Sequence, residues 1–267
     1  MRVLGSIVIL LTLLLPLACS AKGEPFHPPR GGDTVGLAWD NYSNRWWVSD
    51  KNTNTVSYST DAEKGWNTYI SAGNLNLRVD EVFGPIAVAE NTLWLVVEGE
   101  DTAHIVTIET SDDLPMVETG RIEIPPAGRR RSPSVSGLTW DGRYLWLITS
   151  CGLCSNLFQI DPNTGREIFS FFPASNARGI AFRKNGPMYE GELWIIAHNG
   201  PNKDHHLALR EISGSRSTID STKEHFRFGG SRGSPEDPIA LAVRGQQIWT
   251  LDRKTGFIDR YQTIDMP

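Results

Sequence analysis

The sequence predicts an all-β fold made of a repeated four-stranded unit. Three observations support this prediction. A pair of short apolar segments, the second carrying tryptophan, recurs along the chain; turn-forming residues separate the segments; and no segment shows helical periodicity with capping residues. Short apolar segments that are rich in β-branched and aromatic residues and bounded by turns are typical of β-strands.

The segment pair occurs five times, and in each copy a glycine or proline begins the first strand. The five pairs are Gly36–Trp39 with Trp46–Val48, Pro85–Val88 with Leu93–Leu95, Gly137–Trp140 with Leu145–Leu147, Gly179–Phe182 with Leu193–Ile195, and Pro238–Leu241 with Ile248–Thr250. Successive copies begin 49, 52, 42 and 59 residues apart. This spacing is close to the period of β-propeller blades and longer than that of leucine-rich or helical repeats.

Each copy continues with a polar loop, a third strand, a tight turn and a fourth strand. Third strands are expected at Ile105–Ile108 and Leu157–Ile160, and fourth strands at Trp66–Ile70 and Ile168–Phe172. Between the last two strands of the third copy lies Asp161-Pro162-Asn163-Thr164-Gly165, in which proline and glycine favour a hairpin turn.

We therefore expect a β-propeller of five four-stranded blades, because a single four-stranded sheet cannot cover both of its faces. The tryptophans would fill the space between blades. Six blades is the alternative, and it would need an unrecognised blade within Gly214–Pro235. The last copy ends after its third strand, Ile258–Tyr261, so we expect the residues before Gly36 to supply the missing strand and close the ring without a free edge.

The N-terminus predicts export. Arg2 and the apolar run Val3–Leu17 have the layout of a signal peptide, and the run is too short to span a bilayer comfortably. Residues Leu15–Cys19 resemble the bacterial lipoprotein box, which implies acylation of Cys19; simple cleavage near Ala18 or Ala21 is the alternative. We expect a signal peptide at 1–18, a lipidated N-terminus and tether at 19–32, and one propeller domain at 33–267, anchored to the cell envelope through its lipid.

Composition restricts the partners. The formal net charge is −5 and no long basic tract occurs, which argues against a nucleic-acid partner. We expect a monomer, and we expect neither a cofactor nor a resident metal, with calcium as the one alternative.

Ligand sites in such a ring are expected at the end of the axis where two sets of loops emerge together. One set joins the second and third strands, at 50–55, 98–104, 150–156, 198–206 and 252–257. The other joins successive blades, at 30–34, 80–84, 126–136, 174–178 and 231–237.

A Cys-x-x-Cys pair, Cys151 and Cys154, falls in one of these loops. No helix follows to stabilise a thiolate, and no further cysteine remains for zinc once Cys19 is acylated. In an oxidising compartment we expect a local disulfide, with metal binding and redox exchange as alternatives.

Charged residues in the same loops provide the candidates for chemistry. Glu81, Glu98 and His198 are the candidate catalytic residues, since a carboxylate or an imidazole can act as acid and base. His198, His205 and His206 share one expected loop with Asp204, a weak candidate for a metal site. The candidate ligand-binding residues are Asp50, Asp80, Glu100, Asp101, Arg130, Asp237 and Asp252. For Asp50 and Asp252, at the ends of second strands, the alternative role is to hydrogen-bond the loop backbone.

Several motifs resemble plant-type glutaminyl cyclotransferases, which are five-bladed propellers that cyclise N-terminal glutamine. They are His27-Pro28-Pro29, Thr34-Val35-Gly36-Leu37, Phe83-Gly84-Pro85-Ile86, and Gly137-Leu138-Thr139 through Ser150-Cys151-Gly152. The family has Glu between two glycines where this chain has Gly84-Pro85, and Asp where it has Cys151. The resemblance therefore implies the propeller fold. The two departures count against cyclotransferase activity, because the missing carboxylates are the obvious acid/base groups.

Three functions follow, of which a purely structural scaffold is the third. The first is a lipid-anchored extracytoplasmic binding protein that takes a protein or glycan ligand at the propeller mouth. The second is a cyclotransferase-like or hydrolytic enzyme that uses the same face.

Overall fold

The computed structural model describes residues 25–29, 32–61, 64–110, 116–124, 134–150, 155–171, 177–184, 191–199, 204–213, 218–228 and 237–263, with side chains omitted at 198–199, 204–213, 218–228 and 261–263. The predictions for the signal peptide, Cys19, Arg130, Cys151 and Cys154 lie outside these residues. Within them, no helix is long and apolar enough to cross a membrane.

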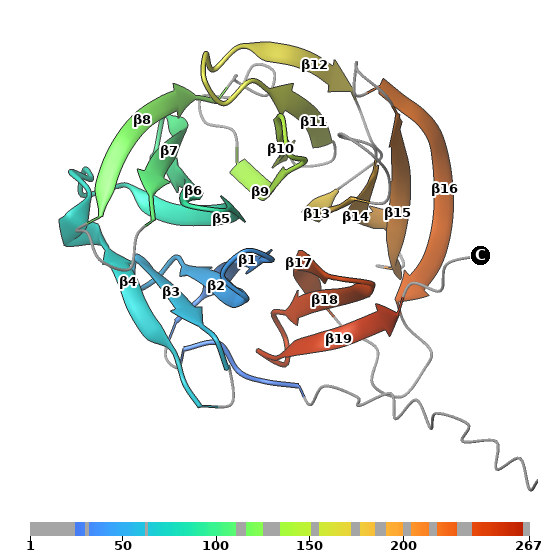
Figure 1. Ribbon diagram of the computed structural model, residues 1–267, viewed down its shortest axis with the longest axis horizontal. Helices are drawn as coiled ribbons and strands as arrows, with labels where there is room; N and C mark the ends of the chain where they lie inside the picture. The colour runs from blue at the N-terminus through green and yellow to red at the C-terminus, as the bar shows by residue number, and fades with distance from the viewer. Residues whose placement is uncertain are drawn as a thin grey trace, which may run out of the picture.

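The described residues form five antiparallel sheets arranged around one axis (Figure 1). The first sheet contains β1 (Thr34–Asp40), β2 (Arg45–Asp50), β3 (Thr55–Ser59) and β4 (Asn67–Ser71). A short 3-10 helix, η1 (Ala72–Asn74), follows it. The second contains β5 (Val82–Ala89), β6 (Thr92–Glu98), β7 (Ala103–Glu109) and β8 (Val117–Glu123).

The remaining sheets repeat this order of strands. The third contains β9 (Ser134–Trp140), β10 (Leu145–Ser150), β11 (Ser155–Ile160) and β12 (Glu167–Phe171). The fourth contains β13 (Arg178–Lys184), β14 (Gly191–Asn199), β15 (Asp204–Ser213) and β16 (Thr218–Phe228). The fifth contains β17 (Pro238–Arg244), β18 (Gln247–Asp252) and β19 (Ile258–Thr263). The stretch in which a sixth blade was considered contains β16, the outer strand of the fourth sheet.

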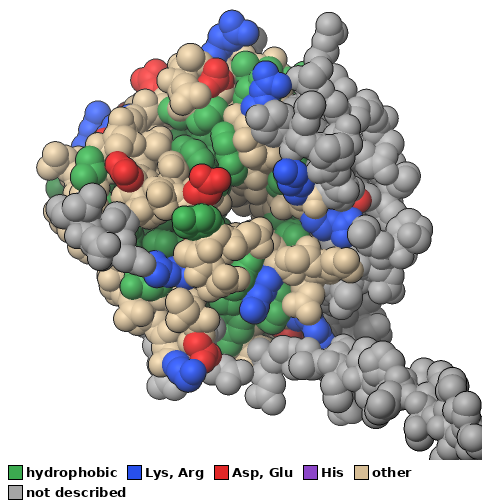
Figure 2. Space-filling view, in the orientation of Figure 1, with side chains coloured by type: hydrophobic (Ala, Val, Ile, Leu, Met, Phe, Trp, Pro, Cys, Tyr) green, Lys and Arg blue, Asp and Glu red, His purple; other side chains and the backbone are tan. Residues whose placement is uncertain are grey.

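The first strand of every sheet lies at the axis. Each of these strands contacts the first strand of the next sheet, in a closed cycle β1, β5, β9, β13, β17 and back to β1. The prediction of an all-β propeller is thus confirmed. The space-filling view shows a hollow at the centre of the ring, surrounded by hydrophobic side chains and individual charged ones (Figure 2).

Glycines at the beginning of the first strands allow this close packing. A Cβ atom on Gly137 would lie 3.0 Å from the backbone nitrogen of Ile180 in the next sheet, and one on Gly36 would lie 3.0 Å from that of Ile86. A distance of 3.0 Å is tighter than nine in ten real Cβ contacts, so a larger residue would require the neighbouring strand to shift by a few tenths of an ångström.

The hydrophobic core lies between neighbouring sheets, as predicted. Trp47 packs with side chains of the second sheet, and Trp146 packs between the third and fourth. Six of the tryptophans are at most 6% exposed: Trp46, Trp47, Trp94, Trp146, Trp194 and Trp249. Burying such large apolar surfaces between sheets is the main stabilising contribution that holds the ring together.

The N-terminal segment joins the first and fifth sheets, but by a single bridge. Phe26 pairs with Ile258 of β19 through two backbone hydrogen bonds of 3.0 and 2.8 Å. Its ring packs against Trp46 and Trp249, with ring centroids 5.5 and 5.8 Å away. The fifth sheet therefore has three strands among the described residues, and one aromatic anchor takes the place of the full fourth strand that the sequence predicted.

Candidate functional site

A cavity of about 360 Å³ lies at the end of the axis where the loops between second and third strands emerge. We call it the mouth cavity. All five sheets contribute to its lining, which consists of Val35, Lys51, Phe83, Gly84, Pro85, Glu98, Ser134, Val135, Ser136, Ser150, Ala177, Arg178, Ile239 and Arg253. It lies at the same end of the ring as the loops that contain the predicted candidate residues.

Three cationic side chains and one carboxylate line this cavity. Lys51 and Arg253 occupy equivalent places, each directly after the last residue of a second strand. The backbone N–H of Lys51 donates to the carbonyl of Asp33 (2.9 Å), and that of Arg253 donates to the carbonyl of Asp237 (3.0 Å). The propeller repeat therefore places two cations at the mouth, one from the first sheet and one from the fifth.

Arg178 contributes the third cation from the beginning of β13. Its guanidinium donates a hydrogen bond of 2.7 Å to a carboxylate oxygen of Asp237, in the joint before the fifth sheet. The predicted ligand-binding residue Asp237 thus lies beside the mouth cavity and holds one of its cations in place. Both side chains are about one third exposed, so solvent screens the pair and it adds little stability.

Glu98, a predicted catalytic residue, lies in the mouth cavity at the end of β6. One of its carboxylate oxygens accepts a hydrogen bond of 2.5 Å from the backbone N–H of Val135 in the next sheet. Burial raises the pKa of this carboxyl group above its ordinary value, although the Val135 N–H and the charge of Lys51 act in the opposite direction. A carboxyl group with a raised pKa keeps its proton to a higher pH than an ordinary one, which is the direction of shift that a proton donor needs.

Asp50 and Asp252 occupy the corresponding ends of β2 and β18, and their carboxylates hold loops in place by accepting hydrogen bonds. Asp50 accepts hydrogen bonds from the backbone N–H and the hydroxyl of Thr53, at 2.8 and 2.9 Å. Asp252 accepts from the backbone N–H groups of Thr255 (2.9 Å) and Asp237 (2.8 Å). Both are 4% exposed and neither lines the mouth cavity, so these contacts support the structural role.

Glu81 also has a structural environment. Its carboxylate is buried and accepts a hydrogen bond of 2.7 Å from the backbone N–H of Arg78, which closes the turn before β5. Asp80 accepts a hydrogen bond of 3.2 Å from the N–H of exposed Glu100, and this interaction lowers the pKa of Asp80. None of these residues lines the mouth cavity, nor does exposed Asp101. Among the residues that the structure describes, no three His, Cys, Asp or Glu side chains come together as a metal site.

The expected loop of histidines is a hairpin of two strands instead. His198 lies near the end of β14 and pairs with His205 of β15. His206 also lies in β15. The apolar pattern Leu193–Ile195 predicts a second strand that stops before His198, whereas β14 continues to Asn199. Their backbones are described and their side chains are not.

Lys51, Arg178 and Arg253 lie within the predicted loops 50–55, 174–178 and 252–257 but are not among the predicted site residues. The available signal was the repeat itself: Lys51 and Arg253 both follow an aspartate at the end of a second strand.

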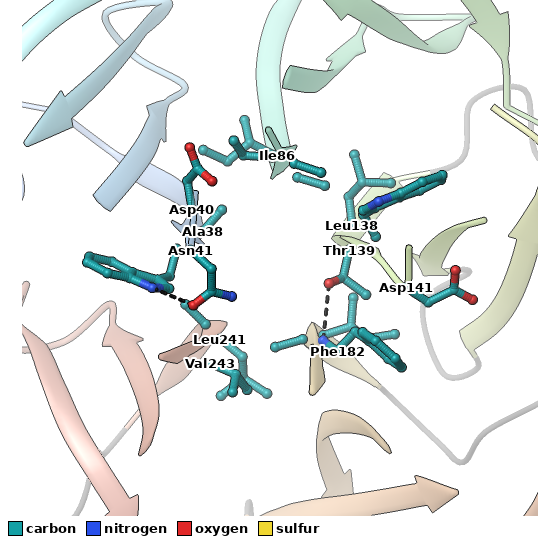
Figure 3. A pocket seen from close by; sticks show the side chains of 18 of the residues that line it. Ala38, Asp40, Asn41, Ile86, Leu138, Thr139, Asp141, Phe182, Leu241 and Val243 are labelled. Atoms are coloured by element: carbon teal, nitrogen blue, oxygen red, sulfur yellow. Dashed lines mark hydrogen bonds between the residues drawn. The ribbon is translucent and has the colours of Figure 1, made fainter. Parts of the chain in front are cut away.

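A second cavity, of about 470 Å³, opens at the opposite end of the axis. Figure 3 shows its apolar wall, which includes Ala38, Ile86, Leu138, Leu241 and Val243. Two of its polar side chains are engaged in hydrogen bonds: the Asn41 carbonyl accepts from the Trp39 indole (3.0 Å), and the Thr139 hydroxyl oxygen accepts from the Phe182 N–H (3.1 Å). The two ends of the axis differ in the sign of their charge. The lining of the second cavity includes three carboxylates, Asp40, Glu90 and Asp141, and one cation, Lys184, whereas the mouth lining has three cations and one carboxylate.

Comparison with known proteins identifies the fold. No protein-family model and no curated protein matches the sequence. Among solved structures, the PQQ-bound aldose sugar dehydrogenase from Streptomyces coelicolor is 11% identical, with a TM-score of 0.55 over 90% of this chain and 97% of that one. A chain of the nidogen/laminin complex is 13% identical, with a TM-score of 0.51 over 86% and 80%.

The calcium-binding protein regucalcin from Agrobacterium tumefaciens is 11% identical, with a TM-score of 0.50 over 90% of this chain and 72% of that one. These neighbours include enzymes and binding proteins, and at such identities they establish a shared architecture only. The protein is a β-propeller.

Proposed function

We propose that this protein is an exported, lipid-anchored propeller of five blades that binds a protein or glycan ligand at the mouth cavity. The observation that supports binding most directly is the cavity itself. It is concave, it is reached by side chains of all five sheets, and it holds Lys51, Arg178 and Arg253. Convergent charged groups over an apolar floor are typical of ligand sites.

The anchor is proposed from the sequence. Leu15–Cys19 resembles a lipoprotein box, and the Pro- and Gly-containing segment that follows suits a tether between the membrane and the ring. In the expressing bacterium, Cys19→Ser should move the protein from the membrane fraction to the soluble envelope fraction. Equal membrane association of the wild type and the variant would contradict the anchor.

Binding is tested with the full chain purified in detergent and presented to glycan and peptide arrays. The double variant Lys51→Glu/Arg253→Glu reverses two charges at the mouth. The control, Lys184→Glu/Arg166→Glu, makes the same charge change on residues that do not line the mouth cavity. We expect binding by the wild type and the control and its loss in the mouth variant. Signals that are equal in all three proteins, or absent in all three, would contradict a ligand site at the mouth.

A second candidate is an enzyme that uses Glu98, and one observation favours it: burial raises the pKa of this carboxyl group within the cavity. A cyclotransferase-like or hydrolytic activity would use Glu98 as the proton donor and acceptor. Peptides with N-terminal glutamine, glycosides and lactones are the substrates to test. Turnover that disappears in Glu98→Gln would favour the enzyme, and no turnover of any of them would eliminate it.

A further inference from the structure

The mouth cavity is polarised around the axis. Arg178, Arg253 and Lys51 come from the fourth, fifth and first sheets, which are consecutive in the ring. Glu98 comes from the second sheet, and Ser134, Ser136 and Ser150 come from the third. One side of the cavity is therefore cationic, and the other side carries a carboxylate and hydroxyl groups.

The cationic side carries more positive charge than the neighbouring carboxylates neutralise. Arg178 is paired with Asp237. Neither Lys51 nor Arg253 forms an ion pair within 4.0 Å of a carboxylate among the described residues, although the charge of Lys51 acts on Glu98 at longer range. A carboxylate ligand suits this arrangement, because a guanidinium can donate two parallel hydrogen bonds to it and an ammonium adds a point charge.

The opposite side offers groups that recognise hydroxyls. One Glu98 oxygen accepts from Val135, which leaves the carboxylate with capacity for a hydroxyl donor. The Ser136 hydroxyl donates to the carbonyl of Ala177 (3.0 Å), so its oxygen can accept a hydrogen bond from a ligand. The volume of about 360 Å³ is near the lower end of the range for small-molecule sites, which suits a single ring.

We propose that the mouth cavity binds an acidic monosaccharide unit of the uronic acid type. Its carboxylate lies between Lys51 and Arg253, and its ring hydroxyls face Glu98 and the serines. This inference rests on the proposed binding function and specifies its ligand. A neutral hexose would leave the cations unpaired, and an acetate ion would leave the hydroxyl-binding side empty.

The test is titration calorimetry of the full chain in detergent at low ionic strength. The ligands are glucuronate, galacturonate, glucose, galactose and acetate. At least one uronate should bind about tenfold or more tightly than its neutral counterpart and than acetate. Added salt should weaken the uronate complex, because the attraction is between charges.

Variants separate the mouth from the rest of the surface. Lys51→Gln/Arg253→Gln should weaken uronate binding about tenfold or more, and Lys184→Gln/Arg166→Gln should leave it unchanged. Both mouth side chains are exposed, so the variants should fold, which thermal melting checks. Equal affinity for hexoses and uronates, or no effect of the mouth variant, would overturn the proposal. If acidic peptides bind and uronates do not, the ligand is not a sugar, and the proposal of a protein ligand at the mouth cavity is retained. If no glycan or peptide on the arrays binds, the proposed binding function itself is wrong.

Discussion

At the scale of single residues, Glu98 differs from the aspartates at the corresponding ends of second strands in other sheets. Asp50 and Asp252, at the corresponding strand ends, are short enough to bond their own loops. The loop after Glu98 is closed by its backbone instead, since the N–H of Gly99 donates to the carbonyl of Thr102 (2.7 Å). The longer side chain is therefore free to cross to the next sheet, where it accepts from Val135 and enters the cavity.

Glu98→Gln should change how stability depends on pH. Because burial raises the folded-state pKa of Glu98, the folded protein holds this proton at pH values where the unfolded chain has lost it. Glu98 therefore costs stability progressively as pH rises from its ordinary pKa through the raised one. The charged groups that face it at the mouth, Lys51, Arg178 and Arg253, are retained in the variant.

Urea unfolding of both proteins between pH 4 and pH 8 measures this effect. The stability of Glu98→Gln relative to the wild type should increase with pH across that window. A difference that stays constant with pH would show that burial does not raise the pKa of this group.

At the scale of elements, the first strands depend on their glycines. Gly137 of β9 lies against the backbone of Ile180 in β13, whereas a Cβ on Gly120 of β8 would meet open space. Alanine normally stabilises a strand relative to glycine, because glycine loses more backbone entropy on folding. The two positions should therefore respond to alanine in opposite ways.

Gly137→Ala should lower the free energy of unfolding by about 1–3 kcal/mol, because β13 must move to make room. Gly120→Ala should be neutral or raise it by up to about 1 kcal/mol. Urea unfolding at neutral pH compares the two. The same small change in both variants would mean that the packing of sheets around the axis is not limited by this contact.

At the scale of the whole molecule, Phe26 is the aromatic residue that connects the first and fifth sheets among the described residues of the N-terminal segment. Phe26 is 9% exposed and contacts side chains of the first and fifth sheets, although it precedes the first strand in sequence. The indole N–H of Trp66, directly before β4, also donates to the carbonyl of His27 (2.8 Å), so a short segment near the N-terminus connects both sides of the closure.

Phe26→Ala should cost about 3 kcal/mol, as expected for removing a buried aromatic ring. Phe169→Ala is the matched control, because Phe169 is 41% exposed and should lose less than about 1 kcal/mol. Hydrogen exchange should also accelerate at the Ile258 N–H in the Phe26 variant, where the bridge opens. Equal costs in the two variants, with unchanged exchange at Ile258, would show that the ring does not depend on this anchor.

The sequence by itself determined the repeated strands, the turns and the packing of tryptophans between sheets, because alternation, turn residues and large apolar side chains act locally in every copy. It also located the end of the axis where the mouth cavity lies and included Glu98. Tertiary structure alone decided which loop residues meet. Lys51 and Arg253 are near opposite ends of the chain, and closure of the ring makes their sheets neighbours. An aspartate or glutamate at a strand end can hydrogen-bond its own loop or enter the cavity. The outcome depends on the length of the side chain and on the position of the neighbouring backbone, and the position of the backbone is set only by the tertiary structure.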